Sequence, residues 1–229
     1  MRHVLVTGAS GNLGKSVINR FLDRGDRVSG IVIPGDETPM HFDSQYFERF
    51  EADLGNEEQA AKTVSSILEK YGDVHIAVLT AGGFAMGGIK ETGSSDLMQQ
   101  YKLNFETAYH VARPVFLKMM EKGRGRIFMV GARPGLDMRN SKGMVAYGLS
   151  KSLVFRLAEL MNEEAKVTDV IVTVIAPSTI DTPQNRKSMP DADFSKWVDP
   201  DEIAHIIHFY TTPDTNGLRE PVLKMYNKA

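Results

Sequence analysis

A glycine-rich stretch directly after a short apolar run near the N-terminus restricts the fold of this chain most. The apolar run covers residues 3–7, and glycines follow at positions 8, 11 and 14, in the spacing G-x-x-G-x-x-G. Such glycines permit a tight turn and let a phosphate approach the backbone N–H groups at a helix start. Strand, turn and helix in this order predict the first βα unit of a dinucleotide-binding sheet. The alternative is a glycine-rich turn that binds no ligand.

The rest of the chain repeats this alternation of short β-branched runs with helical patterns, which is typical of βαβ units and a parallel sheet. The expected strands cover residues 3–7, 27–33, 47–52, 74–80, 126–130, 170–175 and 221–226. The expected helices cover 13–24, 57–70, 95–121 with a kink at Pro114, 146–165 and 203–210. We therefore predict one α/β domain over residues 1–229, a Rossmann-type doubly wound parallel sheet of about seven strands with helices on both faces.

The charge balance argues against a nucleic-acid partner. The chain has 27 Lys and Arg against 29 Asp and Glu, a formal net charge of −2, whereas neutralising phosphates requires a basic excess. Lys118, Lys122, Arg124 and Arg126 form a local basic group, which Glu121 interrupts. We interpret this group as a solvated helix end.

Composition also excludes several kinds of site. The absence of cysteine excludes disulfides, thiolate catalysis and cysteine-based metal sites. The six histidines form no i, i+4 pair and no cluster with carboxylates, so no metal is expected. No apolar run approaches the ~20 residues of a membrane helix, and the N-terminus has no signal-peptide pattern. We expect a cytoplasmic protein without a membrane partner.

Three polar side chains on two predicted helices are candidates for catalysis. Tyr147 and Lys151 are four residues apart, so they face the same side of a helix. An ammonium beside a phenol lowers the phenol's pKa from ~10 and would make Tyr147 an acid usable near neutral pH. The alternative is a surface pair without chemistry. Asn104 is unfavourable inside a helix, so it needs either a catalytic or a structural reason.

Other motifs follow the predicted strands, where a ligand of such a sheet binds. Asp53-Leu54 follows the third strand, and Asp53 could accept a hydrogen bond from an adenine amino group or cap the next helix. The run 81–83 (A-G-G) follows the fourth strand, and Pro177 follows the sixth.

Together these residues resemble the short-chain dehydrogenase/reductase family along essentially the whole chain. The resemblance implies hydride transfer between NADH or NADPH and a small-molecule substrate, with Tyr147, Lys151 and Asn104 as catalytic residues. It also implies a homodimer or homotetramer. The residues that it implies for the dinucleotide are Gly8, Ser10, Gly11, Asn12, Leu13, Gly14, Asp53, Leu54, Ala81, Gly82, Gly83, Tyr147, Lys151, Pro177, Thr179, Ile180 and Thr182.

Residues 81–84, 147–151 and 181–195 are similar to the quinonoid dihydropteridine reductase branch of that family. This implies reduction of a quinonoid dihydropterin-like or similar small planar substrate, with Phe84 and Met189 on the substrate side. Pro134 stands thirteen residues before Tyr147, where the family usually has a serine that this branch also lacks. The alternatives are a carbonyl or quinone reductase of the same family and a nucleotide-sensing protein without catalysis.

The preference between NADH and NADPH stays open. Val32 and Ile33 end the second predicted strand, where members that bind NADH have an aspartate. We therefore expect Val32→Asp to favour NADH. Asp36 and Glu37 come slightly too late in the sequence for this role.

Residues 178–198 form the expected substrate-covering segment. Its part from 181 to 197 contains two prolines and no helical or strand period, which predicts a long loop over the nicotinamide. The alternative is a disordered surface loop. Met189, Phe194 and Trp197 argue against that alternative, because a solvated loop gains nothing from large apolar side chains.

Overall fold

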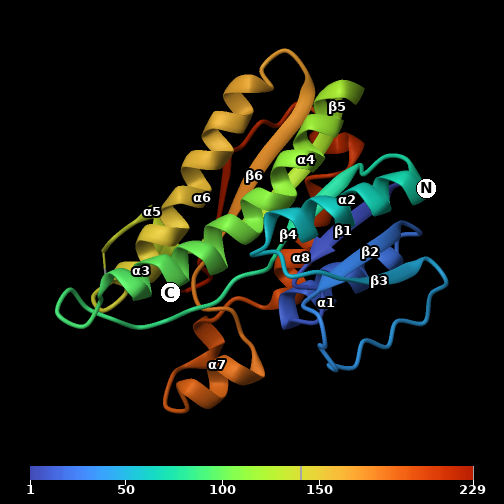
Figure 1. The fold of residues 1–229 in the computed structure, drawn as a ribbon. Coiled ribbons are helices and arrows are strands. Elements are labelled where there is room, and N and C mark those ends of the chain that lie inside the picture. The colour runs from blue at the N-terminus through green and yellow to red at the C-terminus, as the bar shows by residue number, and fades with distance from the viewer. Residues whose placement is uncertain (140, 229) are drawn as a thin grey trace.

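Seven strands form one parallel sheet in the computed structural model, which describes residues 1–139 and 141–228 (Figure 1). The strands are β1 (His3–Thr7), β2 (Arg27–Val32), β3 (Phe47–Glu51), β4 (Ile76–Leu79), β5 (Arg124–Val130), β6 (Asp169–Pro177) and β7 (Val222–Met225). Their order is β3-β2-β1-β4-β5-β6-β7, and every neighbouring pair is parallel. The order reverses between β1 and β4, so ligands are expected at the carboxyl ends of these strands. The predicted doubly wound α/β fold is confirmed.

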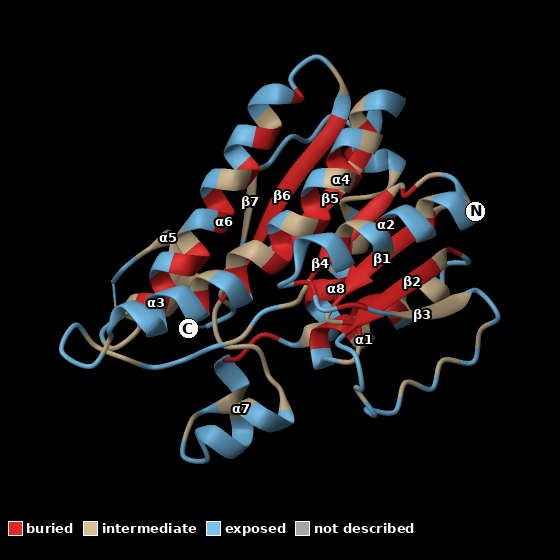
Figure 2. Cartoon of the chain, in the orientation of Figure 1, coloured by how far each residue is buried: buried red, intermediate tan, exposed pale blue. Residues whose placement is uncertain are grey.

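Helices cover both faces of this sheet (Figure 2). On one face lie α1 (Asn12–Leu22) and α8 (Pro200–Phe209), and on the other lie α2 (Glu57–Tyr71), α4 (Thr107–Lys122) and α6 (Val145–Glu164). Successive strand residues point to opposite faces. In β1, Val4 and Val6 therefore pack toward α1 and α8, while Leu5 packs toward α2, α4 and α6. The short apolar runs of the sequence thus supply two cores at once.

The helix predicted over 95–121 changes its hydrogen-bond pattern in one turn. It consists of α3 (Ser94–Tyr101), a π turn (Lys102–Glu106) and α4, which follow one another without a break. Pro114 lies inside α4, which continues to Lys122. The irregularity thus lies at the π turn and not at the proline. A π turn holds one more residue than an α turn, and here it places Asn104 in the interior.

The segment 181–197 is not the structureless loop that its sequence predicted. It contains α7 (Pro183–Ser188) and a 3-10 turn (Phe194–Lys196). Thr182 caps α7, because its hydroxyl oxygen accepts a hydrogen bond from the backbone N–H of Asn185 at 3.1 Å. Pro183 occupies the first helical position, where a missing N–H costs nothing. The helix is too short for its periodicity to show in the sequence. The remaining short elements are α5 (Arg133–Leu136) and a 3-10 turn (Pro213–Thr215).

Candidate active site

The glycine turn packs the start of α1 tightly against the ends of β1 and β4. Gly8 has a φ of +60°, and a Cβ atom there would lie 2.9 Å from the backbone nitrogen of Ala81. At Gly14 a Cβ atom would lie 2.2 Å from the carbonyl oxygen of Gly8. Both positions therefore require glycine for steric reasons, and the turn brings the backbone of α1 close to the sheet edge.

The first turn of α1 has unused hydrogen-bond donors. Gly11 precedes the helix and has no side chain to cap it, and the first N–H that bonds to its carbonyl is that of Lys15 at 2.9 Å. Within residues 1–139 and 141–228, no hydrogen bond uses the N–H of Asn12, Leu13 or Gly14. Free N–H groups at the positive end of a helix dipole suit a pyrophosphate. This turn therefore fits a dinucleotide.

A carboxylate reaches this turn from beyond β2. The Ser10 hydroxyl donates a hydrogen bond to the Asp36 carboxylate, and hydrogen bonds from Ser10 and Thr38 lower the pKa of Asp36 to about 2. The chain returns there because Pro34-Gly35 makes a tight turn, in which Gly35 has a φ of +76°. Asp36 is therefore a candidate for the ribose of the adenosine, although its sequence position had argued against it.

Val32 lies in the core of the domain. Its side chain is 3% exposed and packs in the core under α1 and α8. An aspartate at position 32 would be a buried charge, which argues against the expectation that Val32→Asp favours NADH.

Asn104 is 1% exposed, and hydrogen bonds fix both ends of its amide. Its Oδ1 accepts from the backbone N–H of Gly83 at 3.0 Å. Its Nδ2 donates to Gln100 Oε1 at 3.0 Å and to Ser150 Oγ at 3.2 Å. The residue thus joins α3, α6 and the loop after β4. Sequence reasoning missed Gln100 and Ser150, although Gln100 is one helical turn before Asn104.

Lys151 and Tyr147 extend from α6 to the same edge of the sheet. The Lys151 ammonium is buried and donates a hydrogen bond to the Val130 carbonyl at the end of β5, at 2.8 Å. A Cβ atom on Gly82 would lie 3.3 Å from this ammonium and 2.7 Å from Asn104 Oδ1. The predicted catalytic groups Lys151 and Asn104 therefore flank Gly82, in the loop that follows β4.

The Tyr147 ring meets the edge of the Phe84 ring, with 4.9 Å between centroids and 82° between planes. Phe84 is exposed, so this aromatic pair forms an open wall beside the buried polar groups. Met189, the other predicted substrate residue, is exposed at the end of α7, which stands apart from the sheet (Figure 1).

The acid strength of Tyr147 differs from the expectation. Burial raises the pKa of Tyr147 to about 12 and lowers the pKa of Lys151 to about 8. Loss of hydration disfavours the charged form of each group, and here this effect exceeds any attraction between ammonium and phenolate. The expectation that Lys151 lowers the Tyr147 pKa is therefore wrong for the free protein.

The other predicted dinucleotide residues also lie near strand ends. Asp53 accepts a hydrogen bond from the Gly55 N–H at 2.9 Å, while Asn56 caps α2, so the cap alternative for Asp53 is wrong. Its contact with adenine stays a prediction. Leu54 is buried. Beyond β6, Thr179 and Ile180 follow Pro177, and Ile180 forms a bridge with Val198.

In the part of the chain that the structure describes, no group of three His, Asp or Glu side chains could hold a metal ion. None of the described helices has the length and apolar character needed to cross a membrane. The candidate functional groups of the site are therefore the Asn104 amide, the Lys151 ammonium, the Tyr147 phenol and the glycine turn.

Comparisons with known proteins agree with this geometry. The family model described as short chain dehydrogenase matches residues 2–193. A 3-oxoacyl-acyl-carrier-protein reductase from Vibrio cholerae is 28% identical over 92% of this chain and 89% of its own. A dihydropteridine reductase from Dictyostelium discoideum is 26% identical over 100% of this chain and 96% of its own.

Two solved structures share the fold. ElxO with NADP bound has a TM-score of 0.89 at 22% identity, over 98% of this chain and 96% of that one. An NAD⁺-bound xylitol dehydrogenase has a TM-score of 0.85 at 19% identity, over 99% of this chain and 98% of that one. The first of these proteins thus binds NADP and the second binds NAD.

The buried ammonium predicts a pH dependence of stability. Lys151 binds its proton less tightly in the folded chain, so above pH 8 the unfolded chain holds more protons. The free energy of unfolding should therefore rise by about 2 kcal/mol between pH 8 and 10. In Lys151→Met this rise should be absent, as measured by urea unfolding from pH 7 to 10. Lys62→Met, on the exposed surface of α2, should keep the rise. Parallel curves for the wild type and Lys151→Met would contradict the assignment.

Proposed function

The chain belongs to the short-chain dehydrogenase family, and we propose that this NAD(P)-dependent oxidoreductase reduces a quinonoid dihydropterin-like or similar small planar substrate. The observation that carries the proposal is the open aromatic wall of Phe84 and Tyr147 beside buried Lys151 and Asn104. A planar ring can lie against such a wall with its polar edge at the Tyr147 hydroxyl.

The position of Pro134 favours this substrate class over a carbonyl. Pro134 lies in α5, and its carbonyl oxygen would be 3.3 Å from a Cβ atom on Gly148 of α6. A carbonyl reductase needs hydrogen-bond donors for the developing oxyanion, and a proline provides none from its side chain or its backbone nitrogen. A quinonoid pterin takes up hydride into a conjugated ring and needs only a proton at nitrogen. The dihydropteridine reductase relative, which aligns over the whole chain, also supports this choice.

The high pKa of Tyr147 is compatible with its role as proton donor. At neutral pH the phenol is fully protonated. At pH 7 most of the Lys151 side chains are still charged, and this charge favours the phenolate that remains after proton transfer. Asn104 holds the Gly83 backbone in place and is a candidate anchor for a water relay to Lys151.

A bound reduced nicotinamide would supply the hydride. The N–H groups at the start of α1 would hold its pyrophosphate, and Asp36 would lie at the adenosine ribose. Residues 177, 179, 180 and 182 follow β6 and would lie beside the nicotinamide.

Two alternatives stay in view. A carbonyl or quinone reductase is favoured by the similarity to the Vibrio cholerae enzyme. A nucleotide sensor without catalysis is less favoured, because a sensor has no need for a buried ammonium and a phenol on the same side of one helix.

Tyr147→Phe tests the proposed proton donor. Loss of a positioned acid should lower turnover by about 10²–10⁴-fold and leave cofactor binding within about twofold. Oxidation of NADH or NADPH is followed with a quinonoid dihydropterin, a quinone and an aldehyde, after subtraction of the uncatalysed rate.

Tyr46→Phe, at a partly exposed tyrosine before β3, serves as the matched control and should leave turnover unchanged. Turnover of Tyr147→Phe within threefold of wild type would place the acid elsewhere. A higher kcat/KM with the aldehyde than with the pterin would favour the carbonyl reductase, and no turnover with any substrate would favour the sensor.

We further propose that Asp36 gives a preference for NADH. A charged carboxylate held by Ser10 beside the glycine turn would accept from a ribose 2′-hydroxyl and repel a 2′-phosphate. Asp36→Asn should therefore raise the ratio of kcat/KM with NADPH to that with NADH by about tenfold or more. Glu37→Gln makes the same change of charge one residue away and should leave the ratio unchanged. An unchanged ratio in Asp36→Asn would exclude this role.

The segment 178–198 stays our candidate for a lid. Its two ends are tied together, since the Asp181 N–H bonds to the Val198 carbonyl at 2.8 Å and Trp197 is buried. Nearly all of α7, between these ends, is exposed (Figure 2). A short helix on a closed base can move as a unit toward a bound cofactor.

Limited trypsin digestion tests the lid. Arg186 and Lys196 are exposed in this segment. Cleavage after them should slow about tenfold at saturating NADH or NADPH, because closure would order the segment. Cleavage after Lys166, in the exposed turn before β6, should not change. Equal rates at Arg186 with and without bound cofactor would exclude a cofactor-ordered lid.

The predicted homodimer or homotetramer has support on α4 and α6. Leu117, Leu149, Leu153 and Leu160 are exposed there, and apolar side chains on neighbouring helices suit an interface. We propose that a second copy covers this face. The cytoplasmic location also stays a prediction.

A further inference from the structure

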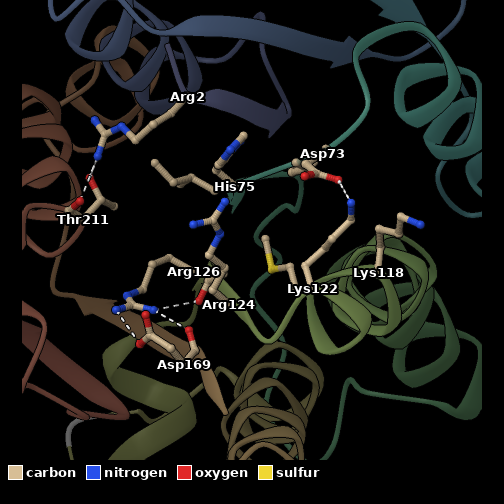
Figure 3. A pocket seen from close by; sticks show the side chains of 13 residues that line it. Arg2, Asp73, His75, Lys118, Lys122, Arg124, Arg126, Asp169 and Thr211 are labelled. Carbon is tan, nitrogen blue, oxygen red and sulfur yellow. Dashed lines mark hydrogen bonds and ion pairs between the residues drawn. The ribbon is translucent and has the colours of Figure 1, made fainter.

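The basic residues Lys118 and Lys122 of α4 and Arg124 and Arg126 of β5 lie around one cavity. With Arg2, which precedes β1, and with residues of β4, β5 and β6, they line a cavity of about 130 Å³ at the amino-terminal edge of the sheet (Figure 3). The positively charged and histidine side chains around it are Arg2, His75, Lys118, Lys122, Arg124 and Arg126. At ~30 Å³ for each water, the cavity has room for about four water molecules, which approaches the size of a phosphate group.

The positively charged side chains of this cavity differ in whether they form ion pairs. Four of them have carboxylate partners: Arg2 with Asp26, Lys118 with Glu121, Lys122 with Asp73, and Arg126 with Asp169. Arg124 is different, because no hydrogen bond or ion pair within residues 1–139 and 141–228 uses its guanidinium. Figure 3 shows it in the cavity without a dashed line to any neighbour. The two carboxylates in the wall, Asp73 and Asp169, are thus paired, and one cation is left over.

His75 adds a second free donor. Its Nδ1 accepts a hydrogen bond from the backbone N–H of His3 at 3.2 Å, so we assign the proton of the neutral ring to Nε2. Burial lowers the pKa of His75, while the Asp73 carboxylate acts to raise it and the charge of Arg124 to lower it. Within the described chain, no hydrogen bond uses this Nε2–H.

We propose that this cavity binds the phosphate group of a small anionic ligand, through the guanidinium of Arg124, the Nε2–H of His75 and the spare N–H donors of Lys122. These N–H groups are free to donate hydrogen bonds, and the neighbouring carboxylates already have cationic partners. Such a set of donors is complementary to the oxygens of an oxyanion. A planar guanidinium can contact two phosphate oxygens at once.

This site is separate from the dinucleotide site. Arg124 opens β5, and Val130, which accepts from Lys151, closes it. Seven residues of extended chain place the two ends roughly 20 Å apart. A ligand in the cavity would therefore bind together with a dinucleotide and not compete with it.

Calorimetric titration with inorganic pyrophosphate tests the proposal. The wild type is first saturated with NADH or NADPH, so that the glycine turn is occupied, and ionic strength is held constant with sodium chloride. We expect one saturable site. Arg124→Gln should bind about 10- to 100-fold more weakly, because it loses the charged donor, whereas Arg124→Lys should bind with intermediate affinity.

Lys62→Gln makes the same change of charge on α2 and should bind as the wild type does. A second measurement follows the His75 ring resonances by NMR, which should shift with pyrophosphate in the wild type and not in Arg124→Gln. Absence of saturable binding by the wild type, equal affinity in Arg124→Gln, or an unmoved His75 ring would each overturn the proposal.

Discussion

The buried ammonium of Lys151 is the interaction on which the rest of the candidate site depends. A charge in a protein interior costs several kcal/mol unless polar groups surround it, and the described hydrogen bonds give this one a single acceptor, the Val130 carbonyl. That bond joins α6 to the end of β5. The bond therefore also helps to fix the position of Tyr147, one helical turn before Lys151, relative to the sheet. The pKa of Lys151 is lowered because burial removes water that this one acceptor does not fully replace.

The sequence predicted the strands and the larger helices because their signals are local. In β6, the eight residues after Asp169 have no charged side chain, and such a run is typical of a strand that is buried on both faces. The placement of Tyr147 and Lys151 on one side of α6 also follows from helical spacing alone. The fold class and this placement were therefore within reach of pattern and spacing.

Contacts between distant parts of the chain were not within reach. The hydrogen bond from Asn104 to Ser150 joins residues 46 positions apart, and no periodicity describes such a pair. Asp36 reaches Ser10 only because a tight turn reverses the chain after β2. The pKa of Tyr147 depends on burial, which spacing does not reveal. In each case tertiary packing decided what local rules left open.

The π turn at 102–106 makes the position of Asn104 depend on residue count. A π turn holds one residue more than an α turn, so removing one residue from it would leave a regular helix in which α3 and α4 keep their relative orientation. The side chains within the turn would then shift, and Asn104 with them, away from the place where Gln100 and Ser150 hold its amide. Homologous chains that keep an asparagine here should therefore also keep the length of this turn. A single-residue deletion within it would leave the helix regular and would displace the Asn104 amide from its partners.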